Sequence, residues 1–121
     1  MKRYPIVPCP APRMTQRDAW AKRPCVLRYH AFRDQVRLHR VTIPDRVRIV
    51  FVLPMPASWS AKKRAAMDGK PHTVRPDGDN LAKGIFDSVF KDDAHIWDVR
   101  YSKIWGQSGE IWIGELTGAI E

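Results

Sequence analysis

Two aspartates on either side of a glycine, followed by a lysine and a third aspartate, are the residues of this sequence best suited to chemistry. Asp77 and Asp79 flank Gly78 just before a predicted helix, so both carboxylates can point at one spot near the helix start. Lys83 follows Asp79 by four residues and therefore projects from the same helical face. Asp93 comes a few residues after the helix, at the predicted start of the next strand, from which it can return toward the pair.

Converging carboxylates of this kind suit Mg²⁺, which prefers hard oxygen ligands and usually keeps part of its water shell. Bound Mg²⁺ polarises a phosphodiester and lowers the pKa of a coordinated water. The plain alternative is a turn with Asp79 as the N-cap of the helix, and a second turn at Asp92 and Asp93. Asp87, two turns after Asp79, suits either a supporting role near a metal or a structural ion pair. Spacing alone leaves both interpretations open.

Other catalytic and metal-binding patterns are missing from the sequence. The acidic run lacks the later Gly and Glu of an EF-hand loop, and neither a phosphate-cradling Gly-rich loop nor a Ser-His-Asp arrangement is visible. Cys9 and Cys25 form no Cys-x-x-Cys unit, so we expect free thiols in a reducing compartment and no structural zinc. We also expect no organic cofactor. We assign no ligand role to the scattered histidines, which are His30, His39, His72 and His95.

Positive charge is concentrated in the first two thirds of the chain. The formal net charge is +8, and residues 1–76 hold 17 of the 21 Lys and Arg but 4 of the 13 Asp and Glu. This excess favours a polyanionic partner, nucleic acid before membrane, because no amphipathic membrane anchor is apparent. Carboxylates beside a phosphate-binding surface repel the same backbone that the cations attract, and a divalent metal would resolve that conflict.

Length and composition indicate one folded domain over residues 1–121. With 121 residues, 44% hydrophobic and 28% charged, the chain suits a single hydrophobic core. No apolar run approaches the roughly 20 residues that span a bilayer, and no apolar segment follows the basic N-terminus. We therefore expect a cytoplasmic protein without a membrane partner.

Hydrophobic periodicity predicts a small α/β (α+β) domain with a mixed sheet of about four strands and two or three helices. The predicted order is strand, helix, strand, helix, strand, strand, with strands over 3–7, 46–53, 96–105 and 110–116 and main helices over 25–38 and 80–90. A Gly-Gln-Ser-Gly turn sequence separates the last two strands, so we expect them to pair as a hairpin.

Two basic, proline-containing stretches interrupt these elements. Residues 8–24 form a segment that cannot be a helix, and residues 55–76 form a basic arm that looks mobile and carries a short helix over 60–67. Trp59 in this arm could stack on an unpaired base, or it could pack at a subunit interface or on the protein's own core. The best candidates for phosphate contact are Lys62, Lys63, Arg64, Lys70 and Arg75, although a solvated basic helix face would look the same. A weaker set comprises Arg13, Arg17, Lys22 and Arg23.

The acidic motif resembles the signature of a nuclease family. Arg-Pro-Asp-Gly-Asp-Asn-Leu-x-Lys, Phe-Asp-Ser-Val and Lys-Asp-Asp-Ala-His-Ile, which begin at Arg75, Phe86 and Lys91, are similar to motifs of the RusA family of Holliday junction resolvases, many of them carried by phages and prophages. The resemblance is dense over residues 74–98 and extends in element order over residues 44–116. The chain departs from better-known members before the first predicted helix, and its basic arm is longer.

This resemblance implies that Asp77, Asp79, Lys83 and Asp93 are the functional residues, with the three aspartates holding Mg²⁺ or a substituting Mn²⁺. It further implies a homodimer that resolves four-way DNA junctions by paired symmetric nicks and leaves 5′-phosphates. One rival is a catalytically idle DNA- or RNA-binding protein that uses the acids as caps. Another is a nuclease for other branched DNA, such as flaps or forks.

Overall fold

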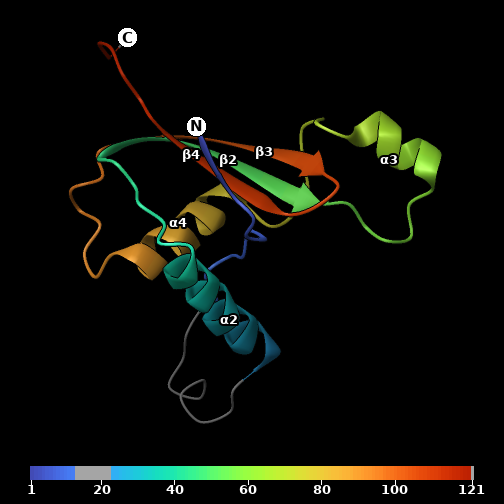
Figure 1. Ribbon diagram of the computed structural model, residues 1–121, viewed down its shortest axis with the longest axis horizontal. Helices are drawn as coiled ribbons and strands as arrows, with labels where there is room; N and C mark the ends of the chain where they lie inside the picture. Colours follow the sequence, from blue (N-terminus) through green and yellow to red (C-terminus); the bar gives the residue numbers. More distant parts are fainter. Residues whose placement is uncertain (13–22, 121) are drawn as a thin grey trace.

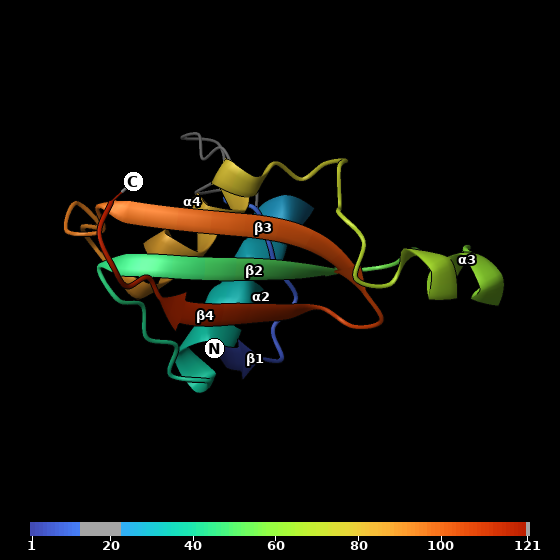
Figure 2. The ribbon, with the colours of Figure 1, turned by 90° about the horizontal axis from the view of Figure 1, so that it is seen from above.

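The structure is a computed structural model that describes residues 1–12 and 23–120. Within these residues, two helices pack on one face of a four-stranded mixed sheet and a third helix projects from its end (Figures 1 and 2). The strands are β1 (Lys2–Tyr4), β2 (Arg46–Pro54), β3 (Asp98–Gly106) and β4 (Glu110–Glu115), and the helices are α2 (Pro24–Leu38), α3 (Ala61–Met67) and α4 (Gly78–Val89). The predicted fold class is confirmed.

The strand order of the sheet is β1-β4-β2-β3, which differs from the sequence prediction at one point. β2 pairs in parallel with β3 and antiparallel with β4, so β3 and β4 are not neighbours and the predicted hairpin is wrong. The apolar β2 takes the central position because its buried residues then gain a hydrogen-bonded strand on each side. The turn after β3 passes the end of β2, where Met55 N donates to the Gly106 carbonyl at 3.2 Å.

The hydrophobic core lies between the sheet and helices α2 and α4. Val47, Ile49 and Phe51 alternate along β2 and are fully buried. α2 begins with Pro24 in its first turn, where a missing backbone N–H costs nothing. The buried residues of α2 recur at helical spacing, whereas Leu38 at its end is exposed. The helices complete the core with Val26, Tyr29, Phe32 and Val36 of α2 and Leu81, Ile85 and Phe86 of α4.

The basic arm leaves the sheet after β2 and returns along the outer edge of β3 (Figure 2). Ser60 caps α3 by accepting a hydrogen bond from Lys63 N at 3.2 Å, and no residue of α3 is buried. On the return, Gly69 N donates to the Trp105 carbonyl and His72 N to the Lys103 carbonyl, at 2.9 and 3.0 Å. The arm is therefore joined to the sheet at both of its ends.

The structure tests only part of the prediction that residues 8–24 contain no helix. Residues 8–12 are irregular, as expected, whereas residues 13–22 lie outside the described part of the chain. Among the helices that the structure describes, none has the length and apolar character to cross a membrane.

Candidate active site

The start of α4 presents two exposed carboxylates. Asp77 is the N-cap residue, and its main-chain carbonyl accepts the first helical hydrogen bond from Leu81 N at 3.1 Å. Asp79 lies in the first turn and accepts from Asn80 N at 2.9 Å, so the prediction that Asp79 is the N-cap is wrong by two residues. The Asp77 side chain makes no capping hydrogen bond. Both carboxylates, here called the acid pair, sit where the helix dipole favours negative charge.

The glycine between the acid pair is a contact point with the sheet. A Cβ atom placed on Gly78 would collide with the aromatic ring of Tyr101 on β3. Gly78 is buried, and the Tyr101 ring also packs near Phe51, with centroids 6.4 Å apart. Glycine is therefore needed here for close approach to β3, and the approach fixes where α4 begins.

Lys103 of β3 holds the segment that leads into the acid pair. Its ammonium group donates to the Val74 carbonyl at 2.8 Å and to the Pro76 carbonyl at 2.7 Å. Tyr101, Lys103 and Trp105 alternate along β3 and therefore share one face of the strand. This face holds the chain from His72 to Gly78, so the sheet sets the position of Asp77.

The N-terminal segment crosses α4 on its other side. Ala11 N donates to the Asn80 carbonyl at 3.3 Å, and a Cβ atom on Gly84 would lie within 2.5 Å of the Cys9 carbonyl oxygen. Gly84 thus permits the segment to lie directly on the helix. Residues 7–10 line one depression beside α4, and residues 11 and 12 line another.

The first depression, here called the Asp77 groove, has a volume of about 780 Å³. Apolar and proline residues from 7–10 and 53–56 form much of its wall. Its polar and aromatic lining comes from Arg28, His72, Arg75, Asp77, Asn80 and Trp105. One carboxylate of the acid pair therefore opens onto a groove with two guanidinium groups.

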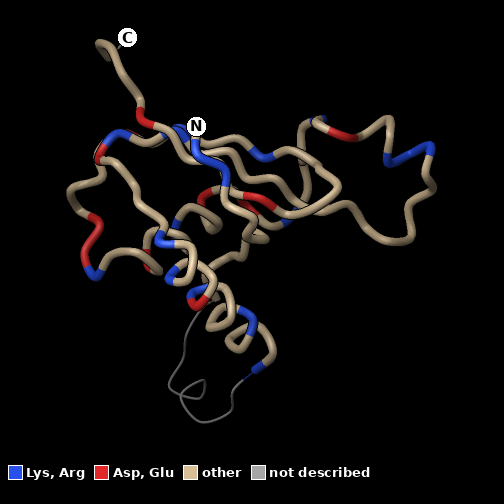
Figure 3. The backbone as a smooth tube through the Cα atoms, in the orientation of Figure 1, with Lys and Arg blue, Asp and Glu red and all other residues tan. Residues whose placement is uncertain are grey.

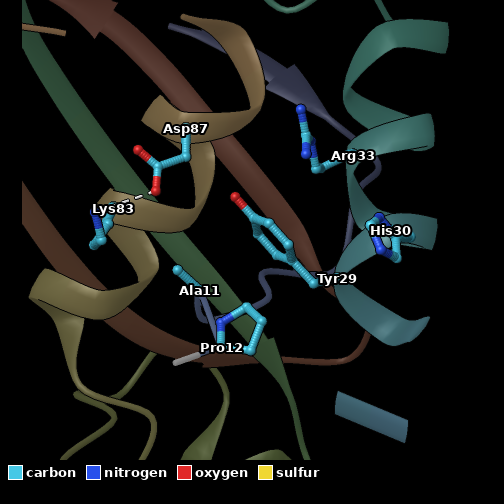
Figure 4. Close-up of a pocket in the computed structure, with 7 residues that line it drawn as sticks. All are labelled: Ala11, Pro12, Tyr29, His30, Arg33, Lys83 and Asp87. Atoms are coloured by element: carbon cyan, nitrogen blue, oxygen red, sulfur yellow. Dashed lines mark ion pairs between the residues drawn. The ribbon is translucent and has the colours of Figure 1, made fainter. Parts of the chain in front are cut away.

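The second depression, of about 460 Å³, contains Lys83 and is shown in Figure 4. Lys83 pairs with Asp87 at 3.2 Å, which favours the structural ion pair for Asp87. The Tyr29 hydroxyl of α2 points toward α4 and donates to the Gly84 carbonyl at 3.0 Å, and burial raises the pKa of this tyrosine. Lys83 keeps the predicted four-residue spacing from Asp79 but lines a different depression from Asp77.

The loop that follows the last residue of α4, Val89, carries Asp93, and it lies at the other end of the helix from the acid pair (Figure 1). It is an exposed loop residue, and β3 begins five residues later at Asp98, so the prediction that Asp93 starts a strand is wrong. The 12 residues of α4 separate the two places by about 18 Å at 1.5 Å per residue. Accordingly, the described residues contain no group of three His, Cys, Asp or Glu side chains placed to hold a metal ion.

The predicted phosphate contacts lie mainly on the projecting arm (Figure 3). Lys62, Lys63 and Lys70 are exposed, as is Arg75 at the groove, whereas Arg64 donates to the Pro56 carbonyl at 2.8 Å. Of the weaker set, Arg13, Arg17 and Lys22 lie outside the described residues and Arg23 precedes α2.

Trp59 packs within the protein. Its ring centroid lies 4.8 Å from that of Trp105, and Lys63 stands over its ring at 4.3 Å. This confirms the packing interpretation of Trp59.

Sequence reasoning missed the residues that position the acid pair. The sequence pattern marks Tyr101 and Lys103 only as strand residues, and Arg28 only as a polar helix residue. The alternation of large side chains in β3 indicates one common face, but their contacts depend on the arm returning beside that strand. No local pattern predicts that return.

Comparison with known proteins places the chain in a nuclease family. The family model described as Endodeoxyribonuclease RusA matches residues 6–114. The uncharacterized protein YqaN of Bacillus subtilis (strain 168) is 33% identical over 88 residues, which cover 64% of this chain and 61% of that protein. The chain thus spans about six tenths of this relative, and no solved structure matches the chain. With a family match over nearly its whole length, this chain belongs to the RusA family of endodeoxyribonucleases.

Proposed function

We propose that this protein is a Mg²⁺-dependent, structure-specific endonuclease that resolves Holliday junctions by paired symmetric nicks. The observation that carries the proposal is the acid pair at the start of α4, beside a groove with guanidinium groups, in a chain of this family. The family indicates the class of reaction. The acid pair offers carboxylate oxygens that suit a metal ion acting on phosphodiesters.

The residues of one chain fit part of a Mg²⁺ site. Asp77 and Asp79 offer exposed carboxylate oxygens on either side of Gly78. Mg²⁺ often uses one or two protein carboxylates and fills its remaining positions with water and substrate phosphate. The third expected ligand, Asp93, lies in the loop beyond the far end of α4, and the described residues of one chain do not bring three such side chains together.

A homodimer would reconcile the expected ligand set with this separation. We propose that Asp93 reaches the acid pair of a second copy, so that two copies form two equivalent sites related by twofold symmetry. The loop that carries Asp93 is exposed from Lys91 to His95 and is open to such a contact. Two sites in one dimer also match the two strands that symmetric resolution cuts.

In the proposed reaction, bound Mg²⁺ would supply an activated water and offset charge on the scissile phosphate. Lys83 stabilises the charge that develops on the phosphate or orients the water, and it exchanges its partner Asp87 for the substrate. Arg75 and the lysines of the arm bind flanking phosphates, so binding weakens steeply with added salt. Hydrolysis adds water across the P–O3′ bond and leaves 5′-phosphate and 3′-hydroxyl ends.

The decisive experiment compares a labelled four-way junction with a linear duplex of the same sequence, in Mg²⁺ or Mn²⁺, for the wild type and Asp79→Asn. We expect paired symmetric nicks in the junction alone, and junction binding without cleavage for the variant. Tight binding with no cut by the wild type would instead favour the idle binder. Flap and fork substrates are added as a further comparison, and preferential cutting of these would favour a nuclease for other branched DNA.

A second experiment tests the shared site. Asp77→Asn and Asp93→Asn are each expected to be inactive, but their mixture should recover partial activity, because one of the two sites in a mixed dimer is then intact. A mixture of Asp77→Asn with Asp79→Asn is the matched control and should stay inactive. No recovery in the first mixture, with subunit exchange verified, would refute a ligand set shared between chains.

A further inference from the structure

The Asp77 groove has a chemical character that the acid pair does not explain. Trp105 and His72 supply aromatic surface, and Arg28 and Arg75 supply positive charge from two different segments of the chain. Its volume of about 780 Å³ falls in the range of roughly 300–1,000 Å³ that is typical of small-molecule sites. An aromatic wall combined with cationic groups suits a ligand that has a flat ring and a phosphate.

A second observation on the groove is that one ring nitrogen of His72 has no hydrogen-bond partner. The side chain is 5% exposed, and its Nδ1 atom is buried without a hydrogen-bond partner. Buried polar atoms in folded proteins are nearly always paired, since an unpaired one is costly. Burial, followed by the nearby charge of Lys103, lowers the pKa of His72, so the neutral ring can both donate and accept. A nucleobase edge carries complementary donors and acceptors.

The aromatic wall is held in place from two sides. The His72 and Trp105 rings have centroids 4.2 Å apart, and Trp59 supports the same Trp105 ring at 4.8 Å. Trp105 N also donates to the Lys70 carbonyl at 3.0 Å, which ties the arm to β3 beneath these rings. A fixed aromatic surface binds an unstacked base without a further entropic cost for its own ordering.

We propose that the Asp77 groove receives one unstacked nucleotide of the cleaved DNA strand, with its base against Trp105 and His72 and its phosphates beside Arg28 and Arg75. This inference rests on the proposed function, because it places the nucleotide next to the phosphate that the acid pair addresses. At the crossover of an open junction the stacking between arms is interrupted, so the cost of presenting one base is lower there than inside a linear duplex. The groove thereby contributes to the choice of substrate structure.

Two other occupants would fit the apolar part of the groove, namely a proline-rich segment or the surface of a second copy. Neither needs two guanidinium groups, and Asp77 connects the groove directly to the site of phosphodiester chemistry. The nucleotide is therefore the occupant that uses both the aromatic and the cationic parts of the lining.

The first test titrates the full-length protein, without metal, with each of the four deoxynucleoside 5′-monophosphates, and monitors the indole signals by NMR. We expect the Trp105 signal to shift, the Trp112 signal on β4 to stay in place as the internal control, and 2-deoxyribose 5-phosphate to leave Trp105 unmoved. Arg28→Ala, a change at an exposed residue, should weaken nucleotide binding by about tenfold, the loss of one charged hydrogen bond.

Shifts that the abasic sugar phosphate reproduces, or that appear only on the arm, would overturn the base-binding site. A Trp105 signal that ignores nucleotides but changes on dilution would assign the groove to a dimer interface instead. Because this titration needs neither metal nor cleavage, an inactive protein that still shifts Trp105 would refute the proposed nuclease function and leave base binding standing.

The second test places 5-iodo-deoxyuridine at successive positions near the crossover of a junction bound to Asp79→Asn. Irradiation should join one position to Trp105 or His72, as identified by mass spectrometry, and the linear duplex should give no such product. His72→Phe and His72→Asn form a matched pair. The amide of asparagine occupies nearly the place of the histidine Nδ1, so Asn should retain any base preference that Phe abolishes. Crosslinks confined to residues outside the groove would contradict the inference.

Discussion

The start of α4 is fixed by contacts with β3, whereas the loop that follows the end of α4 folds partly on itself. The Tyr101 ring packs on Gly78, and Lys103 holds the two carbonyls before Asp77. At the other end, Phe90 and His95 meet edge to face at 4.6 Å within one loop. The acid pair therefore has a direction set by the core, while Asp93 stands on a locally folded, exposed segment suited to meeting another molecule.

Substitution of Asp92 or Asp93 is the most sensitive test of this difference between the two ends of α4. Asp92 accepts a hydrogen bond from Ala94 N at 2.9 Å and is a turn residue, whereas Asp93 is the proposed ligand. Asp93→Asn should lower the rate of junction cleavage by at least a hundredfold, on the order of the loss of metal affinity when a site is disrupted. Asp92→Asn should lower it less than tenfold. If the two substitutions lower the single-turnover rate equally, Asp93 has no role that Asp92 lacks.

Lys103→Met tests whether the sheet positions the acid pair. Losing these two hydrogen bonds, one exposed and one part-buried, should reduce stability by roughly 1 kcal/mol and should raise the Mg²⁺ concentration for half-maximal cleavage. Lys103→Arg, which can still donate to both carbonyls, should restore most of the Mg²⁺ response. A Met variant that melts earlier but keeps the wild-type Mg²⁺ dependence would show that Lys103 is structural only.

Gly78→Ala probes the close approach between α4 and β3. The added methyl group must displace the partly exposed Tyr101 ring, at a cost of about 1 kcal/mol as in mild overpacking. The shift should also lower cleavage several-fold. Tyr101→Ala in the same chain should relieve the clash, so urea denaturation of the two single variants and the double variant should be non-additive. Additive losses would mean that the two residues do not contact.

His72 makes the support of the acid pair sensitive to pH. Its pKa is lowered in the folded protein from the ordinary value of 6.5, so the unfolded chain binds the extra proton more readily. Stability should therefore fall as the pH drops below about 6.5, and His72→Phe should reduce that slope in urea denaturation curves. If the substitution leaves the slope unchanged, His72 is not the cause of the loss of stability at low pH.

Much of the local structure could be predicted from the sequence. The helix over residues 25–38, the strand over 46–53 and the helix at the acidic motif follow from hydrophobic spacing of 3.6 or 2 residues and from flanking prolines. The motif at residues 75–83 also indicated the family through its residue types and their spacing alone. These signals lie within short windows, where neighbouring residues determine the outcome.

Long-range pairing could not be predicted in the same way. The hairpin expected between β3 and β4 failed because turn composition cannot reveal that β2 fits between two strands adjacent in sequence. Likewise, spacing allowed Asp93 to return toward the acid pair, but Asp93 follows the end of α4 by four residues and β3 begins only at Asp98.

By itself, the sequence determined the main elements, the charge pattern and the family, because periodicity, side-chain type and spacing are local properties. Only the tertiary structure decided that Tyr101 and Lys103 support Asp77, that His72 and Trp105 share a groove, and that Asp93 lies in a loop beyond the end of α4. The physical reason is that these contacts join residues distant in the chain, and packing between strand edges and helices selects them.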